Sequence, residues 1–110
     1  MAAILLTNPP RIEQSQHERR TYTVTTTAIG SNPVNVEVNV YDITGRKPGS
    51  WLQRTNVSTT VFSGAVTVVG DVITWPELLN LTPNRIYRVE TLFDTGGNRY
   101  KAVTEVKGLD

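Results

Sequence analysis

Few side chains in this sequence have the types and spacing that catalysis requires. The single histidine, His17, lies between Ser15 and Glu18 in a polar segment. A serine nucleophile needs a histidine base that is itself oriented by a carboxylate. A loop or an extended strand gives these three side chains no reason to converge, so we interpret His17 as an exposed polar residue. The sequence therefore predicts no catalytic residue and no enzymatic activity.

Metal and cofactor chemistry is not expected either. Glu90, Asp94 and Glu105 lie near one predicted hairpin, but we expect strand alternation to separate them, and their spacing does not match a calcium loop. The chain has no cysteine, so it offers no thiolate ligand. Gly96 and Gly97 precede a predicted strand and not a helix, which favours a hairpin turn over a phosphate-binding loop. We expect no metal site and no cofactor.

An apolar segment near the N-terminus is a candidate docking element. Ile4, Leu5 and Leu6 form a short apolar run that is followed by Pro9 and Pro10. An exposed apolar run is costly, so it should pair either with its own sheet or with a neighbouring subunit. Addition of such an arm to another subunit's sheet is one common use, and a first strand in its own sandwich is the other.

A basic, turn-rich loop is the second candidate. Arg46 and Lys47 precede Trp51 across a Pro-Gly-Ser turn. Tryptophan and arginine are enriched at the energetic centres of protein interfaces, which favours a contact role. A tryptophan in this place can equally cap one end of the core, and the sequence leaves both interpretations open.

Composition narrows the class of partner. The 110 residues include 11 basic and 10 acidic side chains, so the chain lacks the clustered basic charge of a nucleic-acid-binding protein. The apolar N-terminal run is too short for a signal peptide and lacks its basic flank. No segment approaches the ~20 apolar residues that span a bilayer. We expect one domain with neither nucleic acid nor a membrane as partner.

Strand patterns dominate the chain. Four valines alternate with polar residues between positions 34 and 40, which predicts a strand whose valines all face the core. Residues 21–29 and 57–62 are also expected to be strands, and residues 77–80 a single helical turn. Two hairpins are predicted, one around Gly70 and Asp71, and one with strands 85–94 and 99–107 around Gly96 and Gly97.

The most specific motif combines Leu81, Pro83, Tyr87 and Val89. Its spacing resembles the tyrosine corner of fibronectin type III and related immunoglobulin-like domains. The resemblance implies an all-β antiparallel sandwich of about seven or eight strands, in which the tyrosine ring packs in the core and its hydroxyl bonds to backbone upstream. Residues 1–20 would be an arm or first strand, and residues 21–110 the sandwich.

The family usually places a tryptophan at the end of its second strand, and no tryptophan stands in that place here. Strand order in the N-terminal half therefore stays open, and a variant sandwich or a jelly roll remains an alternative.

Residues 65–106 also resemble small virion proteins of tailed bacteriophages. The shared pattern is a Val/Thr-rich hairpin, a Leu-Thr-Pro corner, Tyr-Arg and a terminal Gly-Gly-Asn hairpin, with Asn84 in place of the usual glycine. The resemblance implies a structural protein that docks on the capsid as a decoration or cement subunit. Its partners would be the major capsid protein or other virion subunits, with a homo-oligomer as a further option. It would be made in the host cytoplasm and reside in the virion.

The alternative is a fibronectin-type binding module that recognises protein or carbohydrate. A row of exposed aromatic side chains on one sheet would favour carbohydrate, whereas a flat apolar base with a reaching arm would favour capsid attachment.

Overall fold

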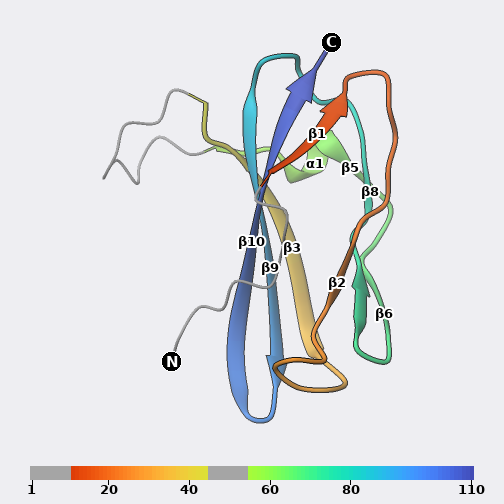
Figure 1. Cartoon of the computed structure of the whole chain (residues 1–110), viewed down its shortest axis with the longest axis vertical. Helices are drawn as coiled ribbons and strands as arrows, with labels where there is room; N and C mark the ends of the chain where they lie inside the picture. The colour runs from red at the N-terminus through yellow and green to blue at the C-terminus, as the bar shows by residue number, and fades with distance from the viewer. Residues whose placement is uncertain (1–10, 45–54) are drawn as a thin grey trace.

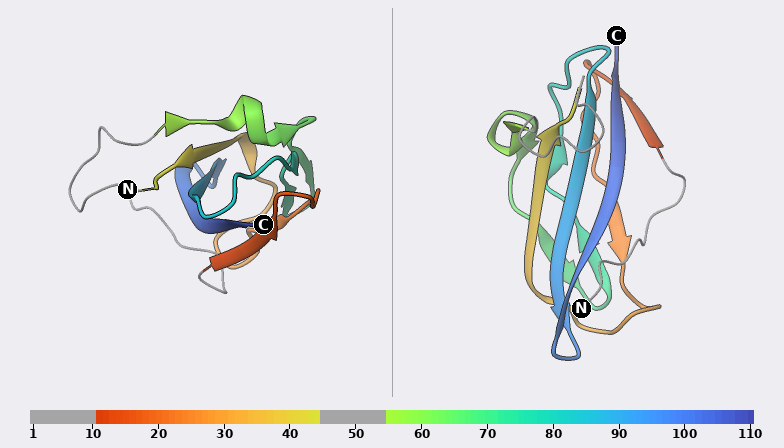
Figure 2. Two further views of the ribbon diagram at one scale, coloured as in Figure 1. Left: turned by 90° about the horizontal axis from the view of Figure 1, so that it is seen from above. Right: turned by 90° about the vertical axis from the view of Figure 1, so that its left-hand side faces the viewer.

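The computed structural model describes residues 11–44 and 55–110. These residues form a sandwich in which a five-stranded and a three-stranded sheet face each other across the core, as Figure 1 and the end-on view in Figure 2 show. They contain ten strands, of which three are only two residues long, and one single-turn helix. The seven longer strands agree with the expected all-β sandwich. Within these two ranges there is no helix with the length and apolarity needed to cross a membrane.

The larger sheet has five strands in the order β1-β10-β9-β3-β4. β1 runs parallel to β10, and every other pair in this sheet is antiparallel. The five strands are β1 (Arg11–Ser15), β3 (Val34–Asp42), β4 (Thr55–Asn56), β9 (Ile86–Thr95) and β10 (Asn98–Leu109).

The smaller sheet has three antiparallel strands in the order β2-β7-β6, and a separate two-stranded ladder joins β5 to β8. Together with the larger sheet, this is the strand order of an immunoglobulin-like sandwich. The elements are β2 (Thr23–Thr25), α1 (Ser58–Val61), β5 (Phe62–Ser63), β6 (Thr67–Val69), β7 (Val72–Thr74) and β8 (Glu77–Leu78).

Both predicted hairpins are present. β6 and β7 pair around Gly70 and Asp71, and β9 and β10 pair around Gly96 and Gly97. The inward side chains of β9 alternate along the strand and are all buried, as predicted. The core joins residues from both sheets: Val24, Val40, Val61, Ile73, Trp75, Leu78, Leu81, Tyr87, Val89, Phe93, Ala102 and Val106.

The tyrosine corner has the geometry expected from its spacing. Tyr87 is 3% exposed and Leu81 is 1% exposed. The Thr82 backbone N–H donates to the Tyr87 hydroxyl at 2.9 Å. Asn84 adopts a φ of 67°, which asparagine tolerates better than most side chains. The corner therefore fixes the chain where it crosses from one sheet to the other.

Polar side chains buried in the sandwich form hydrogen bonds between its elements. The Trp75 indole N–H donates to the Thr91 hydroxyl at 3.0 Å, so this buried tryptophan links the two sheets. Gln14, which is fully buried, donates to the Leu78 carbonyl and accepts the Tyr22 hydroxyl proton. Burial also raises the pKa of Tyr22. These bonds hold β1 beside β2 and β8.

The expectation that all four valines of β3 face the core is wrong for Val34. Val34 is 56% exposed, whereas Val40 is fully buried, and Val36 and Val38 are partly buried against the core. The pairing of β3 with β9 shifts between Val34 and Glu37, and Asn35 there has a φ of 52°. Such a bulge breaks the two-residue alternation, so Val34 turns outward.

Two other local predictions are also wrong. The predicted strand at residues 57–62 is present only at Phe62, which begins β5. Before it, the Asn56 side chain accepts the Ser58 backbone N–H and favours a turn that continues into α1. The residues after Pro76 do not form a helical turn. Their backbone is engaged across the molecule, since Leu78 exchanges hydrogen bonds with Arg20, and Glu77–Leu78 forms β8 instead.

Candidate interaction surface

The residues screened as catalytic candidates stabilise a turn after β1. Glu18 accepts the Ser15 backbone N–H at 2.8 Å and pairs with Arg20. The Ser15 hydroxyl accepts the His17 backbone N–H, while the His17 side chain is exposed. The Ser15 N–H, and then Arg20, hold the pKa of Glu18 below its usual value. The contacts of Ser15 and Glu18 thus belong to turn formation.

The three acidic residues near the last hairpin lie on one face of the sheet, contrary to the expectation that alternation would separate them. Glu90 and Asp94 are four residues apart on β9 and so point the same way. Glu105 pairs in register with Arg88, which shares that side of β9. Basic neighbours come between them, and no group of metal-ligating side chains occurs in the part of the chain that the structure describes.

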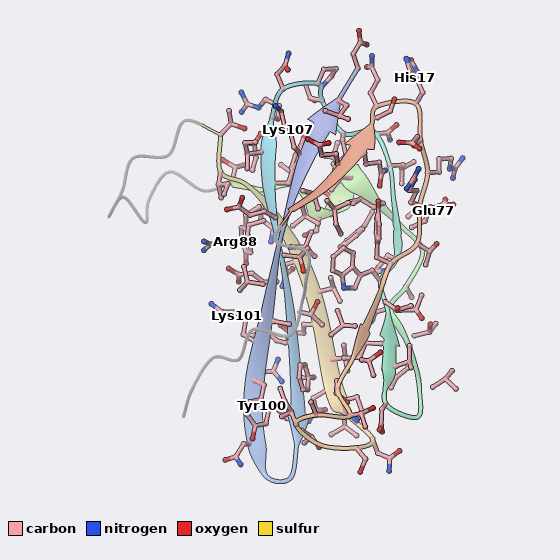
Figure 3. All side chains as sticks on the ribbon, in the orientation of Figure 1. His17, Glu77, Arg88, Tyr100, Lys101 and Lys107 are labelled. Atoms are coloured by element: carbon pink, nitrogen blue, oxygen red, sulfur yellow. The ribbon has the colours of Figure 1, made fainter. Side chains whose placement is uncertain are left out.

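The outward side of β9 and β10 forms what we call the charged face. It carries side chains of both signs of charge: Arg88, Glu90, Asp94, Arg99, Lys101, Glu105 and Lys107. Figure 3 shows Arg88 and Lys101 pointing away from the core on this side.

Ion pairs cross-link the charged face. Arg99 pairs with Asp94 at 3.0 Å, and Lys101 lies 3.9 Å from Glu90. The Asn35 side chain and then Arg99 lower the pKa of Asp94. Arg88 is an exception, since its Nε is buried and has no hydrogen bond within the described ranges. Most of these charges are therefore compensated within the sheet.

The outward side of the smaller sheet has a different character, and we call it the neutral face. Val24 and Ile73 are paired and buried, so their neighbours along β2 and β7 point outward. The register extends across all three strands, aligning Thr23, Thr74 and Thr67 in one row. The six outward side chains are all uncharged: Thr23, Thr25, Thr67, Val69, Val72 and Thr74.

Charged residues lie at the two ends of the neutral face. Beyond one end of its strands, Arg19 pairs with Glu77 at 2.7 Å. At the other end, Asp71 accepts hydrogen bonds from the Thr27 hydroxyl and the Asn32 backbone N–H. A centre depleted of charge and bounded by polar residues is the usual anatomy of a protein interface.

The two docking segments predicted from the sequence both lie outside the residues that the structure describes. Ile4, Leu5 and Leu6 precede the described residues, and Arg46, Lys47 and Trp51 fall in the gap between them. The neutral face was missed, although two signals for it are in the sequence. Residues 55–70 carry no charge, and threonine occupies every second position from 21 to 27.

Comparisons with known proteins add little to this description. No protein-family model matches the chain, and no curated protein matches it. Among solved structures, the chain is similar to an I-band fragment I67-I69 from titin, with 19% identity and a TM-score of 0.49. The match covers 90% of this chain and 29% of that one. The fold is shown by the strand order and the tyrosine corner, which are those of an immunoglobulin-like sandwich.

Proposed function

We propose that the chain is a non-enzymatic structural protein of a bacteriophage virion, and that it docks on the capsid as a decoration or cement subunit through its neutral face. The major capsid protein or another virion subunit would be the partner. The protein would be made in the host cytoplasm and reside in the virion.

The neutral face is the observation that carries this proposal. Its threonines and valines present methyl and hydroxyl groups on a regular three-stranded surface, and Val69 is 78% exposed. Binding would desolvate no charge at the centre of this face, which is favourable because buried unpaired charges are costly. The charged face on the other sheet lacks this advantage.

The size of the face suits an assembly better than an isolated complex. Three strands spaced about 4.8 Å apart, each three residues long, cover on the order of 150 Å². A stable one-to-one interface buries about 800 Å² per partner. A small contact is sufficient where many copies bind a repeating lattice or one copy touches several subunits, because avidity multiplies weak contacts. The resemblance of residues 65–106 to small virion proteins supports a lattice of this kind.

The alternative is a fibronectin-type module that recognises protein or carbohydrate. Carbohydrate recognition commonly uses aromatic side chains, and the neutral face contains none. Its composition therefore supports a protein partner.

The test compares two exposed valines that differ in position. Val69 lies on the neutral face and Val34 lies on the larger sheet, and both are more than half exposed. Val69→Lys and Val34→Lys add the same charge at little cost to folding, which circular dichroism would check. We expect Val69→Lys to reduce sedimentation with assembled particles by about tenfold or more, whereas Val34→Lys binds like the unmodified chain. Equal binding by both variants would contradict docking through the neutral face.

The two segments outside the described residues are tested in the same assay. We propose that Ile4 to Leu6 or the loop with Arg46, Lys47 and Trp51 adds a second contact to the particle. Trp51→Ala, or removal of residues 1–8, should then weaken attachment and leave the circular dichroism spectrum unchanged. Full binding by both variants would exclude these segments. Binding to glycans without affinity for particles would favour the alternative function.

A further inference from the structure

The outer strand of the smaller sheet leaves backbone groups available for pairing. β6 is bonded to β7 on one side only. The two-residue turn at Gly70 and Asp71 makes Val69 and Val72 the hydrogen-bonded pair that closes the hairpin. Because such groups alternate along an antiparallel strand, the N–H and C=O of Val68 point away from β7. Neither group has a hydrogen bond to any described residue outside the ladder.

Apart from its short length of three residues, this edge lacks the features that usually prevent strands from pairing. Natural edge strands carry lysine, proline, a bulge or an inward-pointing charge. Residues 63–70 contain no lysine, no proline and no charged side chain. They are rich in valine and threonine, which have high strand propensity. An edge of this composition favours the addition of another strand.

The side chains on the core side of β6 are incompletely covered. Val68 pairs with the buried Ile73 and so points inward, yet it is 38% exposed. Val66, two residues earlier, is also only partly buried against the core. The sheet ends beside these valines, so a further strand on this edge would shield them from water.

We propose that a second copy of this chain occupies the edge, and that the two β6 strands pair antiparallel about a two-fold axis. The dimer would contain a continuous sheet in the order β2-β7-β6-β6-β7-β2. Within residues 66–69, the register that pairs the most outward-pointing backbone N–H and C=O groups places Thr67 at the two-fold axis. It bonds Val68 of each copy to Val66 of the other and places the two Thr67 side chains opposite each other.

A second copy fits this edge because the strand is complementary to itself. Identical strands pair antiparallel under two-fold symmetry, so each group that donates in one copy meets its acceptor in the other. Residues 55–70 carry no charge, and no like charges approach across the axis. The pairing also joins two neutral faces into one surface of twice the area. The dimer is a separate proposal from docking, since either can hold without the other.

Single cysteines test the proposed register directly, because the chain has none of its own. In Thr67→Cys the two cysteines would face each other as a pair without backbone bonds, with Cα atoms about 4.5 Å apart. That separation is compatible with a disulfide. In Val69→Cys the two cysteines would lie about 13 Å apart along the strands. Thr23→Cys, on the opposite edge of the same sheet, would place them farther apart still.

We expect Thr67→Cys to form a disulfide-linked dimer under mild oxidation at least about tenfold faster than Val69→Cys or Thr23→Cys, as the separations require. Equal rates for the three variants would indicate random collision and overturn the proposal. The proposal would also be overturned if Thr67→Cys formed no dimer at protein concentrations at which Val69→Cys and Thr23→Cys stay monomeric.

A proline provides the matched edge control. Val68→Pro removes only the outward N–H and keeps the bonds of Thr67 and Val69 to β7, a placement that edge strands tolerate. Added to Thr67→Cys, it should reduce dimer formation to the level of Val69→Cys. Ile4→Asp in the same background should have no effect. Loss of the dimer on Ile4→Asp would mean that the N-terminal segment is the occupant, and the two-fold pairing would be wrong.

Discussion

The Tyr87 hydroxyl gives the sharpest test of the fold. Tyr87→Phe removes the acceptor of the Thr82 N–H, a bond of 2.9 Å to a side chain that is 3% exposed. Loss of such a bond, with a partly buried donor left unpaired, costs about 1–2 kcal/mol. Unfolding entropies near 2.1 cal/mol/K per residue convert this to a fall in Tm of about 4–9 °C for a chain of this length. The aromatic ring is kept, so the core volume is nearly unchanged.

The assay is thermal or urea unfolding followed by circular dichroism. Tyr100→Phe is the matched control, since its ring also packs in the sandwich, against Phe93, and no hydrogen bond of its hydroxyl is found in residues 11–44 or 55–110. We expect the control to change stability by less than about 0.5 kcal/mol. Tyr87→Ala should cost at least about 3 kcal/mol because it also leaves a cavity. Equal effects of Tyr87→Phe and Tyr100→Phe would refute the energetic role of the corner.

Three further predictions concern stability. Val40→Ala should cost about 2 kcal/mol in urea unfolding because Val40 is fully buried, whereas Val34→Ala should stay within about 0.5 kcal/mol. Gly108→Ala should lower the Tm by more than about 8 °C, since a Cβ on Gly108 would overlap the Thr82 carbonyl oxygen. Asp42 has a lowered pKa in the folded state. It therefore stabilises the protein above its ordinary pKa of 3.8, and this contribution is lost as the pH falls below that value. Asp42→Asn should flatten the acid limb of a stability–pH curve.

The cause of the Asp42 shift lies in its contacts. Burial alone would raise the pKa of this carboxyl group, but the backbone N–H and the hydroxyl of Thr44, together with Arg85, hold it lower. Arg85 lies 2.8 Å from Asp42. An unchanged acid limb in Asp42→Asn would show that these contacts do not favour the charged form.

Local spacing was sufficient to predict the features that depend on a few neighbouring residues. The turn at Gly70 and Asp71 and the corner at Tyr87 are both set by short sequence signals, and both are present. The alternation along β9 was also readable, because a strand buried on one face repeats every two residues. These features identified the sandwich.

Features that depend on distant partners were not predicted. The parallel pairing of β1 with β10 joins residues over ninety positions apart, and nothing near Arg11 signals it. β8 forms because its backbone bonds to Arg20 and to β5, which outweighs the local preference of residues 77–80. The outward turn of Val34 requires the bulge against β9. In each case a tertiary contact decides the local conformation.

The neutral face shows the same limit at the level of function. Its threonines come from three strands, and only the register between those strands places Thr23, Thr74 and Thr67 in one row. The sequence contained the uncharged stretch at 55–70 but gave no reason to combine it with residues 21–27. The sequence-based prediction of docking relied instead on segments with conspicuous side chains, such as the loop that contains Trp51.

The central claim is that this chain is a virion protein, and its presence in purified particles tests this most directly. Virions would be purified on a density gradient from cells that produce the chain, and their proteins quantified by mass spectrometry. The account predicts that the chain co-purifies through the gradient at a constant ratio to the major capsid protein. Its absence from intact virions, with the full amount recovered in the soluble fraction, would contradict the account.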